Sequence, residues 1–500
     1  MKCDEQKPAC HRCTSTGRSC DWFNEKTATT TTTVSEPSSR NALVLRHPPS
    51  EFTELKSLEL RGFEFFCNKT ARELPGFFNS RFWESLVLQL SHSETAVLHA
   101  AIALGSLHES EEKNGMLVSR ERLIDPRHSV ALRQYNVAIA GLRNRMATSE
   151  REQKVIALAA CLLFIHIELL RGRYDPAIAH LQSGLKILRE MNTRSANADI
   201  GQDEDDKSID SMMATAFARL DLQTAHFGLS TPAMPYAINN AECGVQQLSR
   251  NGFENLVHAK ARCDTLMGST FHFLAKYRPP SSPQALETQD AAIEQKRLLT
   301  LHLGYMDALD RFLDQPDKIP SKKNCQGVIL LRMHLLTTYT LVSVCLAENE
   351  EEAFDQYLAE FKKITSLAKE FLSSFSGANL QGPRLPSLST DWGIIPPLAV
   401  TVMKCRDPNT RRNALSILAS WPHREGFWDA SLVIKLGQQI IDIEESTPPQ
   451  GGFDQSSHVA RMANVFLEVA EDQDHGILTW QRLEPGSAEG RINESYLMHL

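Results

Sequence analysis

Residues 155–191 read VIALAACLLFIHIELLRGRYDPAIAHLQSGLKILREM, and this stretch decides the fold class. Its first part, 155–170, is apolar on nearly every side, which is typical of a helix at the centre of a fold. Gly172 interrupts the pattern, and Asp175 can cap a second helix with Pro176 at its first position. The second helix is apolar on one side, at Ile178, Leu181, Leu185 and Leu188. The stretch therefore predicts a hairpin of two helices.

Similar helical patterns continue on both sides of this hairpin. Ser93 can cap a helix whose apolar face contains Val97 and Leu104. Later patterns cover 127–145, 209–227, 253–277, 285–314, 325–348 and 351–375. No fixed repeat period is present, so we expect an all-α fold class with an irregular, α-solenoid-like helical body over 51–473. Residues 474–500 form a mixed tail in which 477–481 can be a short strand.

Aromatic and charged residues give further expectations about this body. Aromatic residues are dense between Phe63 and Trp83, which indicates a core wedge, with a ligand cavity as the alternative. Arg406, Arg411 and Arg412 lie near Asp407 in the sequence. These residues fit either a buried ion-pair network or a solvated helix start, and we favour the solvated start. The acidic run 350–352 is interpreted in the same way.

Composition limits the classes of function. The 500 residues carry a net charge of −8, so the bulk of the protein is not expected to bind nucleic acid. The 11 cysteines are odd in number and no secretory leader is evident, which favours a reducing compartment. The longest apolar run, 155–165, is shorter than the roughly 20 residues of a membrane span. We find no phosphate-binding glycine loop, nucleophile elbow or paired-histidine metal motif, so we do not expect an enzyme.

Four cysteines lie close together at the start of the chain. Cys3, Cys10, Cys13 and Cys20 follow the pattern C-x6-C-x2-C-x6-C. Four thiolates at such spacings can complete a tetrahedral shell, which suits zinc. The surrounding residues are polar, so metal binding would have to supply the folding energy of this segment. The sequence therefore predicts a zinc module over 1–23.

The cysteine spacing, the start Lys2-Cys3-Asp4-Glu5 and the aromatic Trp22 resemble the second part of the fungal binuclear zinc cluster, the Zn2Cys6 module of fungal transcription factors. That family reads C-x2-C-x6-C, a proline-containing loop, then C-x2-C-x6-to-8-C. The resemblance implies that Cys3 matches the third ligand and that Cys10, Cys13 and Cys20 match the fourth to sixth. It also makes Lys2 and Lys7 the candidates for DNA contact.

The first two cysteines of the family pattern and the basic helix that follows them have no counterpart after Met1. Three interpretations remain open. Met1 is a misplaced start and the true product carries the whole cluster; the cluster is truncated and its four cysteines bind one zinc ion; or the segment is a disordered tail with free thiols. As written, the chain is expected to bind DNA weakly or not at all.

The segment 24–50 is expected to be a disordered linker. It contains TATTTTTVSEPSS at 27–39, which has no apolar periodicity and cannot offset the entropy lost on ordering. It also lacks sustained heptads, so a dimerising coiled coil is not predicted here.

A second resemblance lies near the C-terminal end. The segments DWGIIPPL at 391–398, KCRDP at 404–408 and WPHREGFWD at 421–429 look like those shared by helical regulatory regions of fungal zinc-cluster factors. Their tryptophans are expected to lock neighbouring helices together.

The two resemblances imply a fungal zinc-cluster transcription regulator of the nucleus, with zinc as its cofactor. Its partners would be DNA, weakly if at all, and proteins of the transcription machinery, with no membrane involved. The alternative is a helical interaction protein that descends from such a factor, does not bind DNA, and modulates an intact relative. The sequence does not indicate an oligomeric state.

Overall fold

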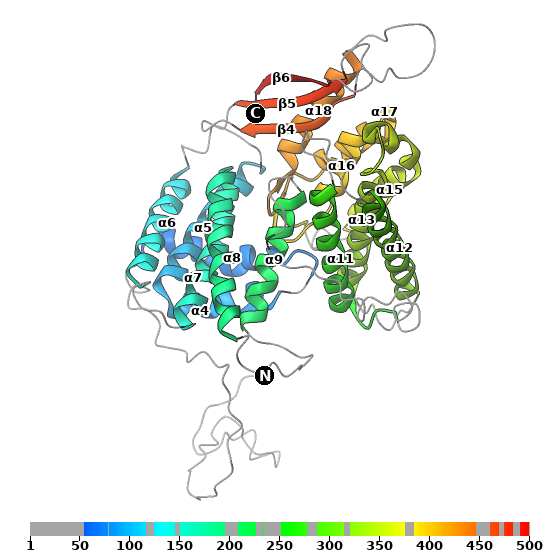
Figure 1. Cartoon of the computed structure of the whole chain (residues 1–500). Helices are drawn as coiled ribbons and strands as arrows, with labels where there is room; N and C mark the ends of the chain where they lie inside the picture. Colours follow the sequence, from blue (N-terminus) through cyan, green and yellow to red (C-terminus); the bar gives the residue numbers. More distant parts are fainter. Residues whose placement is uncertain are drawn as a thin grey trace, which may run out of the picture. The chain divides into compact units, whose positions relative to one another are not determined.

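The computed structural model describes residues 55–78, 80–116, 125–145, 151–195, 209–226, 233, 252–277, 288–314, 321–375, 385–446, 461–469, 475–483 and 491–499. All of them fall within one unit, Leu45–Leu500. The predicted zinc module at 1–23 and the predicted linker at 24–50 lie outside the described residues. The described part is predominantly helical, which confirms the main expectation for the fold class (Figure 1).

In the first group, the helices predicted at 127–145, 155–191 and 209–227 are present close to those ranges. Its elements are α2 (Ser57–Phe65), the π-helix η3 (Phe66–Thr70), α3 (Ala71–Glu73), the π-helix η4 (Phe82–Leu86), α4 (Val87–Ser93), α5 (Thr95–Lys113), α6 (Pro126–Arg145), α7 (Arg151–Leu170), α8 (Tyr174–Ser195) and α9 (Ile209–His226). Ser93 is the last residue of α4 and does not cap α5. Glu94 takes that position without a side-chain cap, because the chain turns directly from one helix into the next.

The predicted hairpin is formed by α7 and α8. Every residue from Val155 to Leu170 is buried, as the all-round apolar pattern indicated. Gly172 has a φ of +70°, a left-handed conformation that glycine adopts easily, and it separates the two helices. Helix α8 begins at Tyr174, so Asp175 lies in its first turn and not at the cap position. A carboxylate in the first turn still interacts favourably with the helix dipole.

Helices α2 and α5 cross at unusually short range. A Cβ atom added to Gly105 would lie 2.2 Å from the carbonyl oxygen of Gly62 and 2.8 Å from Cβ of Phe66. Only glycine therefore allows the two backbones to approach this closely. The aromatic residues of this region pack inside the fold: Phe63, Phe66, Phe77, Phe78, Phe82 and Trp83 are all buried. The predicted core wedge is confirmed.

The second group of helices surrounds a continuous apolar core. Its elements are α11 (Leu256–Tyr277), α12 (Thr288–Leu313), α13 (Lys322–Val344), α14 (Glu350–Ala353), the 3-10 helix η7 (Phe354–Tyr357), α15 (Leu358–Ser373), α16 (Ile395–Lys404), α17 (Pro408–Ala419) and α18 (Ala430–Ser446). Trp392, Trp421 and Trp428 all belong to this core. The expectation that the tryptophan segments lock neighbouring helices is therefore confirmed.

Two small sheets depart from the purely helical expectation. The first contains β1 (Leu388–Ser389), β2 (Arg424–Glu425) and β3 (Trp428–Asp429), with β1 parallel and β3 antiparallel to β2. Strands of two residues have no periodicity that a sequence could reveal.

The second sheet is antiparallel and contains β4 (Ala463–Val469), β5 (His475–Leu483) and β6 (Arg491–His499). The predicted strand at 477–481 lies within β5. The sheet lies on both sides of the boundary predicted at residue 474. Leu478, Trp480 and Met498 pack with Ile440 of α18 beneath it.

Two described helices, α7 and α13, are long and apolar enough to cross a membrane. In α7 89% of the apolar window is buried inside the fold, and in α13 72%. Both are therefore core helices, and no membrane association is indicated by them.

Candidate functional site

Strand β2 lies at a buried polar junction, which we call the β2 junction and define as His423, Arg424 and Glu425 with the groups they contact. The backbone N–H of Arg424 donates to the carbonyl of Ser387 at 3.0 Å, so β2 is held beside the segment that carries β1. Gly426 follows with a φ of +54°, which turns the chain back into β3. All three named side chains are buried.

Arg424 binds the C-terminal end of α7. Its Nη1 donates to the carbonyl oxygens of Leu169 and Leu170, each at 2.8 Å, and these are among the last carbonyls of the helix. Nε lies 3.0 Å from the carboxylate of Asp429, and Nη2 lies 3.6 Å from Glu111. Burial alone would lower the pKa of Arg424, but these two carboxylates raise it. A permanent cation therefore sits where the helix dipole is negative.

Glu425 binds the N-terminal end of α16. Its carboxylate accepts the backbone N–H groups of Gly393 and Ile394, each at 2.8 Å, and of Ile395 at 3.1 Å. These N–H groups precede or open the helix and have no partner within it. His423 completes the arrangement, since its Nε2 lies 2.7 Å from Oε1 of Glu425. Neighbouring residues of one short strand thus hold a helix C-terminus and a helix N-terminus.

Two buried histidines connect the same segment to the first group of helices. His108 of α5 contacts Thr70 through Nδ1 at 3.0 Å and Ser387 through Nε2 at 2.8 Å. His166 of α7 contacts Thr390 at 3.0 Å. Burial lowers the pKa of each histidine to about 3, so both are neutral at physiological pH.

Ser387, His108 and Glu73 have the residue types of a hydrolytic triad, but their geometry does not fit one. In a triad the carboxylate binds the ring nitrogen remote from the serine. Here Nδ1 of His108 is occupied by Thr70, and the Glu73 carboxylate accepts directly from the N–H and hydroxyl of Ser387, at 2.8 and 3.1 Å. Because Ser387 and His108 are also buried, the arrangement positions helices and offers no nucleophile to a substrate.

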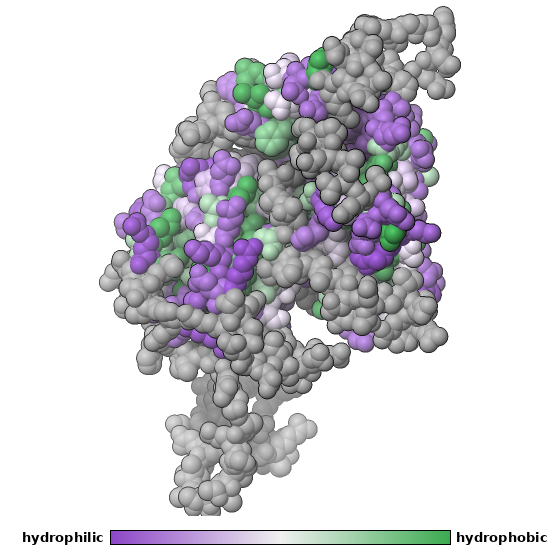
Figure 2. Space-filling model, in the orientation of Figure 1, coloured by the Kyte–Doolittle hydropathy of each residue, from purple (hydrophilic) through white to green (hydrophobic). Residues whose placement is uncertain are grey.

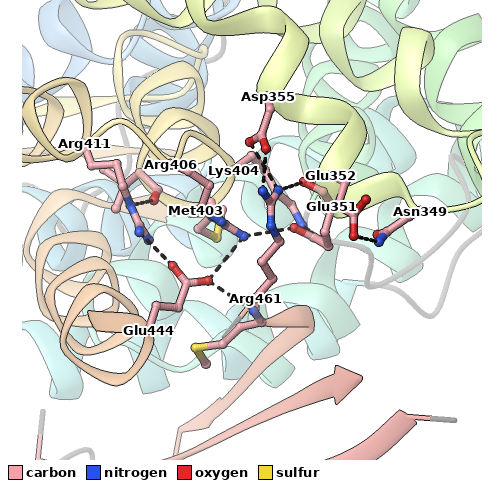
Figure 3. Close-up of polar contacts among 12 residues, drawn as sticks. Asn349, Glu351, Glu352, Asp355, Met403, Lys404, Arg406, Arg411, Glu444 and Arg461 are labelled. Atoms are coloured by element: carbon pink, nitrogen blue, oxygen red, sulfur yellow. Dashed lines mark hydrogen bonds and ion pairs between the residues drawn. The ribbon is translucent and has the colours of Figure 1, made fainter. Parts of the chain in front are cut away.

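A second polar cluster lies where α14, α16, α17 and α18 meet the C-terminal sheet (Figure 3). Glu444 of α18 accepts from Arg411 at 2.7 Å, and its other oxygen lies 3.2 Å from Arg406. Arg406 also reaches Glu351 at 3.2 Å, and Glu351 pairs with Lys404. We call these five residues the Glu444 cluster.

The Glu444 cluster corrects two expectations. Arg411 and Glu351 are both buried, so the preference for a solvated helix start was wrong for these two residues. It was right for Arg412, which is exposed. The helix start itself is present, since Asp407 caps α17 by accepting the N–H of Thr410 at 2.8 Å. The sequence does not reveal this network, because the acidic partner, Glu444, is distant along the chain and lies in a helix without any motif.

Arg461 and Met462 attach the sheet to this cluster. Arg461 donates to the backbone carbonyl of Glu351 at 2.6 Å and pairs with Asp355 (Figure 3). The backbone N–H of Met462 donates to Glu444 at 3.1 Å. The residues just before β4 are therefore fixed to the helical body by charged groups.

The structure does not describe the residues that were predicted to bind metal and DNA. Cys3, Cys10, Cys13, Cys20, Lys2 and Lys7 all fall outside the described residues. Within the described ranges, no group of three or more His, Cys, Asp or Glu side chains could hold a metal ion. The described cysteines are thiols that form no disulfide with one another: Cys67, Cys161, Cys263, Cys325, Cys345 and Cys405. Burial raises the pKa of Cys161 to about 12, so it stays protonated.

Comparison with known proteins finds a family match in the first part of the helical body. Residues 61–271 match the family model described as the fungal specific transcription factor domain. The chain is therefore a fungal transcription regulator. This match, together with the relatives below, confirms the expected regulatory function and the expectation that the protein is not an enzyme.

Two curated relatives are similar to this regulator. The aspercryptin biosynthesis cluster-specific transcription regulator of Emericella nidulans is 22% identical, over 89% of this chain and 85% of its own length. A transcription regulator of Purpureocillium lilacinum, lscL, is 28% identical over 39% of this chain and 48% of its own length. No solved structure matches the regulator.

The β2 junction joins the family-matching residues to the C-terminal segments. Leu169, Leu170 and His108 lie within 61–271, whereas Arg424 and Ser387 lie far outside it. The segment 421–429 was expected to lock helices through its tryptophans, but no role was predicted for His423, Arg424 or Glu425. The available signal was three successive ionisable residues between two tryptophans, because charges inside an apolar segment must be paired if it is buried.

Proposed function

We propose that this regulator acts in the nucleus through a zinc module at its N-terminal end, and that its helical body transmits regulatory signals to that module. The spacing of Cys3, Cys10, Cys13 and Cys20 carries this proposal. Their four thiolates would hold zinc, which prefers a tetrahedral sulfur shell. Lys2 and Lys7 would contact DNA phosphates or base edges. The match of residues 61–271 to the fungal domain supports the same assignment.

The helical body suits a regulatory role because its distant parts are coupled. The β2 junction holds helix ends from α7 and α16 through charged groups on adjacent residues. A signal that moves one of these helices must therefore act on the other, since neither charge can be left unpaired in the interior. The signal itself would be a small ligand or a protein partner.

Metal content of the purified 500-residue chain tests the zinc module. We expect one zinc ion per chain, lost in Cys10→Ser and retained in Cys325→Ser, which removes an exposed described cysteine. Zinc retained in Cys10→Ser, or its complete absence from the wild-type chain, would reject the four-cysteine site.

A gel-shift assay tests the DNA function of the same chain. We expect weak binding at best from this chain, because residues 1–23 match only the second part of the family pattern. Nanomolar, sequence-specific binding would contradict this expectation. Weak binding that is lost with Lys2→Ala and Lys7→Ala would support their role in DNA contact.

The similarity to a regulator named as specific for a biosynthesis cluster suggests the class of target. We propose that this regulator likewise controls a group of neighbouring biosynthetic genes. Deleting its gene should then change transcripts from one contiguous locus together. Changes scattered over the genome, or none, would argue against a cluster-specific role.

The alternative function is a helical interaction protein that does not bind DNA. In this alternative, the four cysteines that match the family pattern are not part of a DNA-binding module. Translating the genomic sequence upstream of Met1 separates the two. An in-frame Cys-x2-Cys followed by a basic run supports the DNA-binding regulator, and a stop codon supports the interaction protein.

A further inference from the structure

The Glu444 cluster carries more positive charge than negative charge. Its five residues are three cations, Lys404, Arg406 and Arg411, and two carboxylates, Glu351 and Glu444. Lys404 and Arg406 share Glu351, and Arg406 and Arg411 share Glu444. Arg411 and both carboxylates are buried. Since a buried charge is costly without an opposite charge beside it, the single excess positive charge should attract an anion.

Carboxylates close to the cluster are already engaged and do not supply that anion. Asp355 pairs with Arg461, which makes a neutral unit. Asp407 accepts a backbone N–H at the start of α17, and Glu352 accepts from Asn349. Within the described ranges, none of these three carboxylates forms an ion pair with a cation of the Glu444 cluster. Neighbouring side chains therefore leave the excess charge in place.

The two arginines of the cluster also have N–H groups without an acceptor. In the described part of the chain, neither Nε of Arg406 nor Nη2 of Arg411 has a hydrogen-bond partner, and both atoms are buried. The other nitrogens of the two guanidinium groups are engaged by backbone carbonyls and by the carboxylates of the cluster. A buried donor without an acceptor destabilises a fold, so such atoms mark places where water or an ion binds.

Both guanidinium groups lie at the same carboxylate. Arg411 binds one oxygen of Glu444 at 2.7 Å, and Arg406 lies 3.2 Å from the other (Figure 3). Burial lowers the pKa of Arg411, and the positive charge of Arg406 lowers it further. A water molecule can accept the two N–H groups, but it leaves the excess charge uncompensated. An anion accepts them through stronger, charge-assisted hydrogen bonds and also compensates the charge.

We propose that Nε of Arg406 and Nη2 of Arg411 bind one small inorganic anion of the halide class, such as chloride. Both atoms are enclosed by the protein, which favours a monatomic anion over phosphate or the carboxylate of a larger ligand. Glu444 also accepts the N–H of Met462 just before β4, so the bound anion should help to hold the start of the C-terminal sheet. The proposal does not depend on the proposed function.

Thermal unfolding of the full-length chain tests the site. Sodium chloride replaces sodium gluconate at constant ionic strength, from about 5 to 200 mM chloride. Gluconate is too large for an enclosed site, so we expect chloride to give a saturable rise in unfolding temperature of at least about 2 °C. Hydrogen exchange should slow for the amides of 462–469. An unfolding temperature that is independent of chloride, or that rises without saturation, would overturn the proposal.

Two variants localise the anion. Arg406→Met removes one donor and leaves two one-to-one pairs, Lys404 with Glu351 and Arg411 with Glu444, so the rise with chloride should disappear. Lys404→Met keeps both donors but removes the excess charge, which should weaken chloride binding at least about tenfold. Two substitutions are used so that the misfolding of one leaves a test. A wild-type rise in either variant would contradict a site built on these arginines and this charge.

Arg412→Met is the matched control. Arg412 follows Arg411 directly, but it is exposed and pairs with Glu445 at the surface. The surface around α17 is largely hydrophilic in the space-filling view (Figure 2), so water screens this charge. We expect Arg412→Met to keep the full rise with chloride, and circular dichroism must show all three variants folded. Equal loss of the rise in Arg412→Met would assign the effect to general electrostatics and overturn the buried site.

Discussion

Nη1 of Arg411 lies 2.7 Å from Oε2 of Glu444, and this buried ion pair joins α17 to α18. Burial lowers the pKa of Arg411, and nearby Arg406 adds to that effect, so the pair depends on the Glu444 carboxylate. Removing one member of a buried pair leaves a charge without compensation, which costs about 3–5 kcal/mol. The consequences can be measured with matched variants.

Glu444→Gln should lower the free energy of unfolding by about 3 kcal/mol. It removes the negative charge between two arginines and weakens the acceptor for the N–H of Met462. Glu445→Gln is the control, because Glu445 pairs with Arg412 at the surface. It should cost less than about 0.5 kcal/mol. Urea unfolding measures the free energy of unfolding of both variants. An equal loss in Glu444→Gln and Glu445→Gln would contradict a buried Glu444 cluster.

Arg424→Lys should loosen the end of α7 although the charge is kept. An ammonium group cannot reproduce the guanidinium fork that reaches Leu169, Leu170 and Asp429 together. We expect faster amide hydrogen exchange in the turn after α7. Arg412→Lys, at an exposed position, should leave exchange there unchanged. Full protection of that turn in Arg424→Lys would show that the carbonyl contacts are dispensable.

Gly105→Ala should destabilise the protein, whereas Gly141→Ala should not. A methyl group at 105 meets the backbone carbonyl of Gly62 at 2.2 Å, and overpacking of this kind costs about 1–3 kcal/mol. At 141 the nearest atom is 3.7 Å away, which is ordinary contact. Alanine there should be neutral or stabilise the helix by up to about 1 kcal/mol. Thermal unfolding measures both variants. An equal change in unfolding temperature for Gly105→Ala and Gly141→Ala would refute the close crossing of α2 and α5.

His302 should make stability depend on pH. Burial lowers its pKa to about 4 from the ordinary 6.5, so the unfolded chain binds one more proton between these values. Its stabilising contribution is therefore complete above about pH 6.5 and is lost as the pH falls toward 4. His302→Gln removes this linkage. From pH 7 to 5 the wild-type chain should lose about 2 kcal/mol more than the variant. Urea titrations measure the free energy of unfolding at each pH. If it changes with pH equally in the wild-type chain and in His302→Gln, the lowered pKa of His302 is contradicted.

The sequence predicted the helices well where apolar periodicity was long. The hairpin of α7 and α8 was evident because burial on all sides leaves a continuous apolar run. The two-residue strands were not evident in the sequence, because β2 is defined only by its pairing with neighbours at Leu388 and Trp428. The polar partners of Arg411 and Arg424 were equally hidden, because the pairing of distant charges is set by tertiary packing and by no local pattern.

The β2 junction also has a consequence for biosynthesis. Arg424 follows the end of the family-matching region by about 150 residues, so it leaves the ribosome later by roughly 8 to 30 seconds at about 5–20 residues per second. Until then the terminal carbonyls of α7 lack the cation that holds them in the finished protein. A message cut short before this codon would yield an incomplete body, exposed to chaperones and proteases, although the whole family-matching region had been translated.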